Sequence, residues 1–92
     1  MNFEYETNKI FLKSHDGKII SEITFPKEDD NVVNINYVFV DESMRGKGIA
    51  DKLMKEAVEQ IKKSNKKVIA SCPFAKSWFQ KNQEYQNLLV KA

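Results

Sequence analysis

The feature that most constrains the fold of this chain is a short basic turn between an alternating apolar stretch and a long amphipathic pattern. Residues 33–40 alternate as in a β-strand, and residues 49–63 carry apolar side chains at helical spacing. Between them lies the turn Arg45-Gly46-Lys47-Gly48-Ile49-Ala50. Glycines let backbone N–H groups approach a ligand closely, and a helix N-terminus presents unpaired donors with a partial positive charge. This succession predicts an anion site, and hence a small-molecule partner that carries phosphate.

The residues before this turn predict three antiparallel strands. Residues 9–14 and 19–25 form two alternating segments, and Asp16-Gly17 between them is a two-residue hairpin signal. Pro26 and the acidic residues 28–30 predict a loop. Both faces of residues 33–40 are partly apolar, which predicts one central strand covered on both sides. One face of that strand is expected to carry Val33, Ile35, Tyr37 and Phe39.

The residues after the turn predict a helix, a strand and a second helix. The first helix is expected over residues 49–63, ending at Ser64-Asn65, with a core-facing stripe of apolar residues. A strand over residues 68–72 should pair in parallel with the earlier strand, because a helix separates the two. A last helix is expected at 75–82 and a short strand at 88–90. The predicted fold is a single α+β domain over residues 1–92, with a mixed, mostly antiparallel sheet and two main helices.

Composition argues against several classes of function. An apolar fraction of 41% and a charged fraction of 30% are those of a soluble globular domain. A net charge of +2 is too small to indicate nucleic acid as a partner. No apolar run approaches the roughly 20 residues that cross a bilayer, and the N-terminus has no signal-peptide pattern. The lone cysteine, Cys72, can form no internal disulfide, which favours a cytoplasmic location.

The turn also resembles the acyl-CoA-binding motif of the GNAT superfamily of N-acetyltransferases, Q/R-x-x-G-x-G/A. Arg45, Gly48 and Ala50 stand at its three defined positions, and the resemblance runs from about residue 34 to residue 85. It implies an acetyl-CoA-dependent N-acetyltransferase without a metal, in which an amine attacks the thioester directly in a ternary complex. The implied contacts are the main chain of Val38, Phe39 and Val40 for the pantetheine arm, and the amides of Arg45, Gly46, Lys47, Gly48, Ile49 and Ala50 for the pyrophosphate.

The segment from Cys72 to Phe79 departs from the family pattern N-x-x-A-x-x-x-Y. Cysteine replaces the usual asparagine, and Phe79 replaces the tyrosine that often protonates coenzyme A. Two residues are candidates for the missing acid. Cys72 follows a strand and precedes a helix, where ligands tend to bind and a thiolate is favoured, so it could protonate the coenzyme thiolate or accept the acetyl group. Tyr85 could supply a phenol. Core packing is the alternative interpretation of both residues.

The acceptor and the general base are less defined. Asn34 and Asn36 either line the pocket or pair with neighbouring polar groups. The candidate bases, each of which could equally be a surface charge, are Glu22, Asp41 and Glu42.

The family usually inserts helices between its first strands to shape the acceptor pocket, whereas this chain has only a tight Asp-Gly turn. This difference predicts an open acceptor site, which either suits an extended or large amine such as a peptide or protein lysine, or is completed by a partner subunit. Two other functions stay open, namely a non-catalytic acyl-CoA-binding module and a small protein-interaction domain in which the turn is purely structural.

Overall fold

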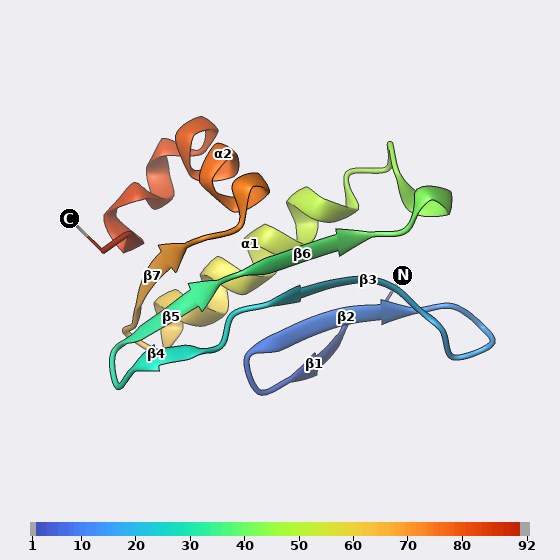
Figure 1. The fold of residues 1–92 in the computed structure, drawn as a ribbon, viewed down its shortest axis with the longest axis horizontal. Helices are drawn as coiled ribbons and strands as arrows, with labels where there is room; N and C mark the ends of the chain where they lie inside the picture. Colours follow the sequence, from blue (N-terminus) through green and yellow to red (C-terminus); the bar gives the residue numbers. More distant parts are fainter. Residues whose placement is uncertain (1, 91–92) are drawn as a thin grey trace.

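A computed structural model describes residues 2–90 of the 92-residue chain. In that range the chain forms two sheets, with strand orders β1-β2-β3-β6 and β4-β5-β7, and two α-helices (Figure 1). The strands are β1 (Glu4–Glu6), β2 (Lys9–Lys13), β3 (Ile19–Thr24), β4 (Lys27–Asp29), β5 (Val32–Ile35), β6 (Tyr37–Val40) and β7 (Lys67–Ala70). The α-helices are α1 (Ile49–Lys63) and α2 (Pro73–Lys81), and the 3-10 helices are η1 (Glu42–Met44) and η2 (Gln83–Leu88). The predicted α+β class is confirmed.

Helix α1 has the bounds and the buried face that the sequence predicts. It begins after Gly48 and ends at Ser64, with Lys62 and Lys63 in its last turn, where positive charge is favourable. Its apolar stripe packs against β2, β3, β6 and β7, so the core lies between this helix and the sheets. The stripe consists of Ile49, Leu53, Met54, Ala57, Val58 and Ile61, all buried.

The prediction of one strand over residues 33–40 is wrong, because the chain breaks at Asn36 into β5 and β6. Strand β5 pairs in parallel with β7, as predicted, whereas β6 pairs antiparallel with β3 in the other sheet. At the break, the Asn36 N–H lies 3.3 Å from the Thr24 carbonyl, and Tyr37 is also opposite Thr24. Two residues opposite one define a β-bulge. The bulge therefore sends the two halves of the predicted strand into different sheets.

The bulge also changes which side chains share a face. Val33 and Ile35 are buried in the core before the break, but Tyr37 and Phe39 lie on the opposite side of the sheet after it. The rings of Tyr37 and Phe39 stack with their centroids 6.4 Å apart, and Tyr37 is 46% exposed. Strand β6 is an edge strand, so the prediction of a central strand covered on both sides is wrong for residues 37–40.

The predicted hairpin is confirmed, with a longer turn. Strands β2 and β3 pair antiparallel, and the Ser14 N–H donates to the Lys18 carbonyl at 2.9 Å. Gly17 has a φ of +84°, so a glycine in the left-handed region closes a three-residue loop where a two-residue turn is predicted. As predicted, no helix is inserted between these strands.

The remaining short elements differ from the predictions. Residues 26–30 contain the short strand β4 in place of a loop, and β1 was not predicted at all. Helix α2 begins at Pro73, since proline fits the first turn of a helix. Residues 88–90 do not form a strand, because Leu88 ends η2 and Leu89 makes a single parallel bridge to Val68.

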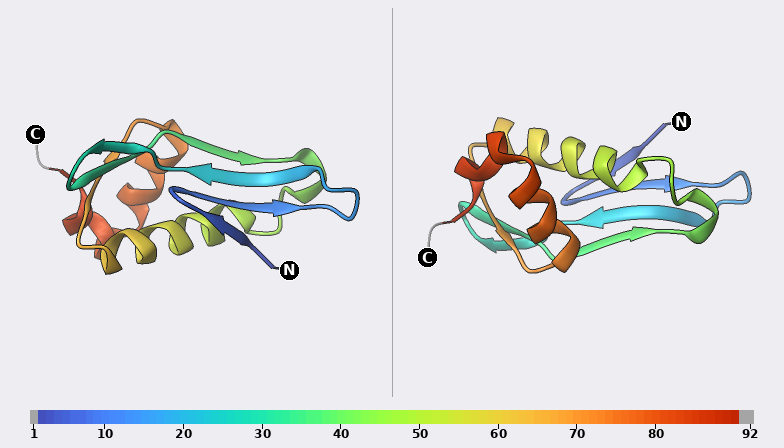
Figure 2. Two further views of the ribbon diagram at one scale, coloured as in Figure 1. Left: turned by 90° about the horizontal axis from the view of Figure 1, so that it is seen from below. Right: turned by 90° about the horizontal axis from the view of Figure 1, so that it is seen from above.

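Figure 2 shows α1 on one side of the four-stranded sheet. Within residues 2–90, no helix covers the other side, which we call the open face (Figure 2). None of the described helices is long and apolar enough to span a membrane.

Candidate functional site

Within residues 2–90, strand β6 has no partner strand along its second edge, which we call its free edge. The Asp41 N–H donates to the Ile20 carbonyl at 2.8 Å, so antiparallel alternation directs the N–H and C=O of Phe39 toward β3 as well. The same alternation directs those of Val38 and Val40 to the free edge, while their side chains pack on the core. Of the three residues whose main chain is predicted to contact the pantetheine arm, Val38 and Val40 therefore direct their backbone groups to this edge, and Phe39 directs its own toward β3.

The turn after η1 gathers backbone donors at the start of α1. Gly46 and Gly48 have φ values of +81° and +74°, which L side chains rarely adopt. Within the described residues, no backbone N–H from Gly46 through Asp51 has an acceptor, and the first helical bond runs from the Lys52 N–H to the Gly48 carbonyl at 3.1 Å. Such donors at a helix N-terminus suit an anion. They surround a hollow of about 140 Å³ lined by Val40, Met44, Arg45, Gly46, Gly48, Ile49 and Ala50.

Two side chains tie this turn to its neighbours. Arg45 Nε donates to the Val40 carbonyl at 3.3 Å, which links the turn to the end of β6. Asp41 Oδ2 accepts from the Ser43 hydroxyl at 2.6 Å and from its N–H at 3.1 Å, and these bonds hold the pKa of Asp41 below its usual value. Asp41 is therefore a charged cap of η1 rather than a free base. Lys47 is exposed.

Cys72 lies where the two sheets diverge. Its N–H is 3.2 Å from the carbonyl of Ile35, the last residue before the bulge. It occupies the N-cap position of α2, its side chain makes no capping bond, and it is 9% exposed. Phe79, at the position of the family tyrosine, is 1% exposed in the core. The structure thus brings Cys72 next to the start of β6 and leaves Phe79 without a role in proton transfer.

Tyr85 is not brought to the turn. Its ring stacks on Trp78 with centroids 5.4 Å apart, and its hydroxyl donates to Glu59 Oε2 at 3.2 Å. Burial and then the bond to Glu59 raise the pKa of Tyr85, so the phenol stays protonated. Glu59 follows Ile49 by ten residues, about 15 Å along a helix, so this phenol lies far from the donors of the turn.

Among the predicted bases, Glu22 alone lies beside β6 with its side chain on the open face. It pairs across the strands with Phe39, and Lys9 Nζ lies 3.6 Å from its carboxylate. The side chains of Lys9 and Glu22 are 30% and 18% exposed. Glu42 lies in the exposed helix η1. Lys9 was not among the predicted site residues, although the hairpin register, which pairs Phe11 with Glu22, places Lys9 diagonally across from that carboxylate.

Asn34 and Asn36 pair with neighbouring polar groups, the second of the two predicted interpretations. The Asn34 amide donates to Glu28 at 2.8 Å, and its oxygen accepts from the Ser71 hydroxyl at 2.8 Å. The Asn36 oxygen accepts from the Thr24 hydroxyl at 2.6 Å. Both asparagines therefore stabilise the region where the sheets diverge.

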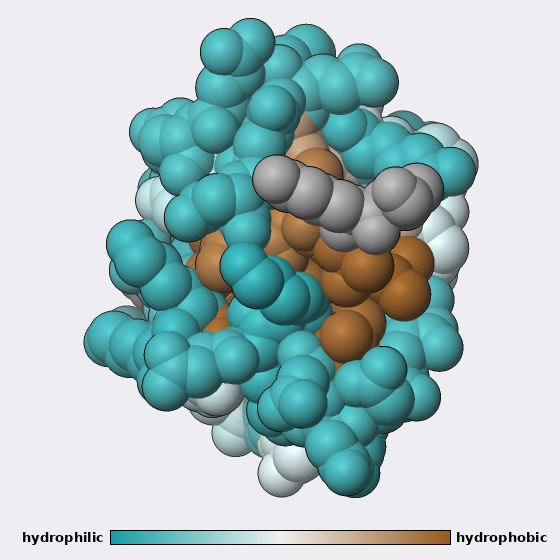
Figure 3. Space-filling model, turned by 90° about the vertical axis from the view of Figure 1, so that its left-hand side faces the viewer, coloured by the Kyte–Doolittle hydropathy of each residue, from teal (hydrophilic) through white to brown (hydrophobic). Residues whose placement is uncertain are grey.

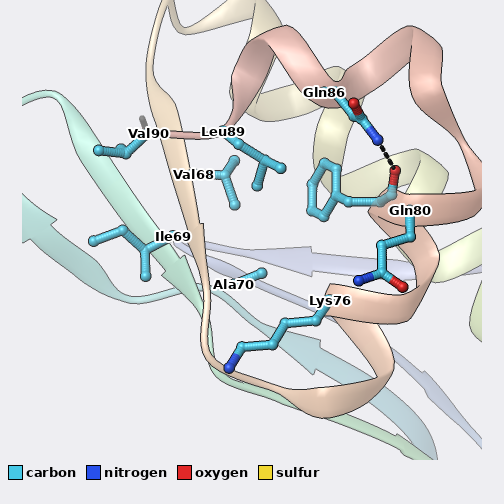
Figure 4. Close-up of a pocket in the computed structure, with 9 residues that line it drawn as sticks. Val68, Ile69, Ala70, Lys76, Gln80, Gln86, Leu89 and Val90 are labelled. Atoms are coloured by element: carbon cyan, nitrogen blue, oxygen red, sulfur yellow. Dashed lines mark hydrogen bonds between the residues drawn. The ribbon is translucent and has the colours of Figure 1, made fainter. Parts of the chain in front are cut away.

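A larger hollow, of about 470 Å³, lies elsewhere, between β7, α2 and the C-terminal segment (Figure 4). Figure 3 shows apolar surface gathered at this end of the molecule. The larger hollow shares no lining residue with the hollow at the turn, so only the smaller one adjoins the predicted anion site. The larger hollow is lined by Val68, Ile69, Ala70, Lys76, Phe79, Gln80, Gln86, Leu89 and Val90.

The sequence of residues 4–88 matches a family model described as GCN5-related N-acetyl-transferase. The chain belongs to this family. Among curated proteins, no sequence matches it. The family assignment agrees with the motif at the turn and with the fold described above.

Solved structures of the GCN5-related N-acetyltransferase family share this architecture. The solution structure of a GCN5-like N-acetyltransferase candidate from Staphylococcus aureus is 32% identical, with a TM-score of 0.82, and the match covers 99% of this chain and 89% of that one. Escherichia coli YhbS, in complex with CoA, is 24% identical with a TM-score of 0.58, covering 67% of this chain and 38% of that one. Rv2747 of Mycobacterium tuberculosis, in complex with CoA and NLQ, is 18% identical with a TM-score of 0.65. That match covers 83% of this chain and 47% of Rv2747. This chain thus spans less than half the length of these two larger proteins.

Proposed function

We propose that this chain transfers the acetyl group of acetyl-CoA to an amine, with the cofactor bound along the free edge of β6 and at the turn before α1. The observation that carries this proposal is the continuity of two sets of unpaired donors. The free edge of β6 ends at Val40. The side chain of Arg45, a residue of the turn, donates from Nε to the Val40 carbonyl oxygen at 3.3 Å. Val40 also lines the hollow at the turn. One elongated ligand with an amide-containing arm and a pyrophosphate matches this arrangement.

Each part of the site has a distinct task. The N–H groups from Gly46 to Asp51 bind the pyrophosphate, assisted by the positive end of α1. The N–H groups of Val38 and Val40 bind the pantetheine arm, and one of them faces the thioester oxygen, where negative charge develops during acyl transfer. The CoA complexes of the Escherichia coli and Mycobacterium tuberculosis proteins support this choice of cofactor.

The transfer itself needs a proton donor for the departing sulfur. The amine nitrogen attacks the thioester carbonyl carbon, the carbon–sulfur bond breaks, and the thiolate takes a proton. Cys72 supplies that proton from its thiol and recovers one from the attacking nitrogen through solvent. Its place beside Ile35, the end of β5 and two residues before β6 begins, supports this role.

The test compares steady-state acetyl transfer by the wild type, Cys72→Ser and Cys72→Ala, with acetyl-CoA and a panel of amines. General acid–base catalysis typically contributes about 10²–10⁴-fold, so kcat should fall by at least about 100-fold in Cys72→Ala with coenzyme affinity unchanged. Tyr85→Phe, which removes only the hydroxyl bonded to Glu59, is the matched control. An unchanged kcat in Cys72→Ala, or a large decrease of kcat in Tyr85→Phe, would show that a group other than Cys72 donates the proton.

A non-catalytic acyl-CoA-binding module is the second candidate. It is favoured by the burial of Phe79 at the position of the family tyrosine. If acetyl-CoA binds but no coenzyme A is released across the amine panel, this second function replaces the first.

A further inference from the structure

Asp51 stands at the end of the row of donors assigned to the pyrophosphate. It is the third residue of α1, and its N–H is the last of the backbone donors, beginning at Gly46, that have no acceptor within the described residues. A carboxylate in the first turn of a helix favours the helix, but this one also places a negative charge beside a site for an anion. The contacts of the carboxylate indicate what else it does.

Two groups hold the Asp51 carboxylate, one from each helix. Lys55 Nζ, in α1 itself, lies 3.1 Å from Asp51 Oδ2. Trp78 Nε1, in α2, donates to Asp51 Oδ1 at 2.8 Å. A hydrogen bond to an ionised carboxylate is about twice as strong as one between neutral groups. The indole bond therefore ties α2 to the residue that ends the anion site.

The indole that makes this bond is fixed by packing. Trp78 is 5% exposed. Its ring stacks on Tyr85 with centroids 5.4 Å apart and meets Phe79 edge-on at 5.3 Å. The ring cannot turn away from α2 without losing both aromatic contacts, so the position of Asp51 and the position of α2 depend on each other.

The N-terminal end of α2 carries Cys72, the proposed proton donor. Cys72 is the N-cap residue, six residues before Trp78, or about 9 Å along a helix axis. Its carbonyl accepts from the Lys76 N–H at 3.0 Å, and its side chain makes no capping bond, so the direction of the thiol follows the orientation of α2. A continuous path thus runs from the donors of the turn, through the bond between Asp51 and Trp78, to this thiol.

We infer that Trp78 is a positioning residue for acetyl transfer: its bond to Asp51 holds α2, and hence Cys72, in register with a coenzyme bound at the start of α1. This inference rests on the proposed function. The bond affects the step in which the thiol protonates the departing sulfur, whereas the backbone of the turn holds the coenzyme. A misplacement of about 1 Å can cost about 100-fold in rate. Loss of the indole bond is therefore expected to lower kcat and to spare coenzyme affinity.

Kinetic comparison of four variants isolates the bond. Trp78→Phe keeps an aromatic ring but removes the donor, and it should lower kcat by about 10- to 100-fold with the dissociation constant of acetyl-CoA unchanged. Asp51→Leu removes the acceptor and should lower kcat to a similar extent. Asp51→Asn keeps an oxygen that can accept from the indole, so it should lower kcat less than Asp51→Leu does. Lys55→Met is the matched control, because it removes the partner of Asp51 that lies within α1, and its kcat should equal that of the wild type.

An NMR titration with inorganic pyrophosphate tests the path in the wild type, where no variant has to fold. Trp78 is the only tryptophan of the chain, so its indole resonance is assigned without ambiguity. Pyrophosphate should shift this resonance together with the amides of residues 46–51. It should also shift the amide of Cys72, which lies beside Ile35, five residues before Val40 and roughly 16 Å away along a strand, a length that pyrophosphate does not span. In Trp78→Phe the Cys72 shift should disappear.

Three results would overturn the inference. One is an unchanged kcat in Trp78→Phe. Another is a decrease of kcat in that variant with an equal loss of coenzyme affinity, as a damaged core would produce. The third is an indole resonance that does not respond to pyrophosphate when the amides of the turn do.

Cys72→Ala separates this inference from the proposed function. If acetyl transfer falls in Cys72→Ala but not in Trp78→Phe, the proposed function stands and the positioning role is wrong. If kcat falls in Trp78→Phe alone, the group that α2 positions is not Cys72, and the inference is wrong. If the wild type releases no coenzyme A with any amine, the proposed function and the inference are both overturned. A loss of kcat in both variants with coenzyme affinity retained supports both.

Discussion

At the scale of single residues, the two glycines of the turn carry the strictest requirement. Gly46 and Gly48 hold positive φ angles, and although a Cβ at either would meet no atom within 4 Å, the backbone conformation itself disfavours a side chain. The strain of a left-handed non-glycine residue is about 1–2 kcal/mol. A substitution there is therefore expected to disturb the donors of the turn rather than the core.

Gly48→Ala is predicted to weaken acetyl-CoA binding by about tenfold or more, because loss of one hydrogen bond to a charged group amounts to about 1.5–3 kcal/mol. Calorimetric titration measures this change. Gly17→Ala is the matched control, since Gly17 has a similar φ of +84° and an empty Cβ position in the hairpin. Equal coenzyme affinities for the two variants would show that the turn does not bind the pyrophosphate.

Ser21 gives a prediction about stability. It is fully buried, and its hydroxyl has no partner in the part of the chain that the structure describes. Removing an unsatisfied buried hydroxyl removes a desolvation cost, so Ser21→Ala should leave the free energy of unfolding unchanged within about 0.5 kcal/mol or raise it. Ser71→Ala, which breaks a 2.8 Å bond to Asn34, should lower it by about 1 kcal/mol. Urea denaturation measures the free energy of unfolding of both variants. A larger decrease in Ser21→Ala than in Ser71→Ala would mean that the Ser21 hydroxyl has a hydrogen-bond partner.

At the scale of elements, a polar contact joins α1 to α2. Trp78 Nε1 donates to Asp51 Oδ1 at 2.8 Å, and this bond, with a smaller contribution from Lys55, lowers the pKa of Asp51 below 3.8. A carboxyl with a lowered folded pKa stabilises the fold above its unfolded value and loses that contribution as the pH falls. The contact is therefore expected to be pH-dependent.

Trp78→Phe is predicted to lower the free energy of unfolding at pH 7 by about 1 kcal/mol from the lost bond, a modest value because the Asp51 side chain is 46% exposed and screened. Loss of packing adds to this. The difference from the wild type should begin to shrink as the pH falls below about 4, where the unfolded carboxyl takes up its proton, and should vanish only below the lowered pKa of folded Asp51. Denaturation at pH 7 and pH 3 tests this, and a difference that does not change with pH would contradict the role of Asp51.

The sequence predicted the features that local residue patterns determine, and failed for those that depend on contacts between strands. Helix α1 has an apolar stripe over four turns, and tertiary packing follows that stripe, so its bounds were correct. The bulge at Asn36 depends on the bond to Thr24, a contact between strands that the alternation of residues 32–40 does not reveal. The turn residues were found from local sequence alone. The register of β6 with β3 is needed to show that the backbone groups of Val38 face the free edge and those of Phe39 face β3. The register of the β2–β3 hairpin is likewise needed to show that Lys9 lies beside Glu22.

At the scale of the whole molecule, the groups proposed to bind the cofactor and the group proposed to donate the proton lie in different parts of the fold. The turn and the start of α1 lie on the helix-covered side of the four-stranded sheet, Cys72 lies where the sheets diverge, and the open face lies opposite α1 (Figure 2). The chain lacks helices between β2 and β3, so nothing in the described residues encloses that face.

The most direct test of the central claim is an NMR titration of the wild-type protein with acetyl-CoA, followed through its backbone amides. The account predicts saturable shifts at Val38 and Val40, from Gly46 through Asp51, and at Cys72, with little change at the hollow lined by Val68 and Leu89. Shifts confined to that larger hollow, or no shifts at millimolar acetyl-CoA, would contradict the account.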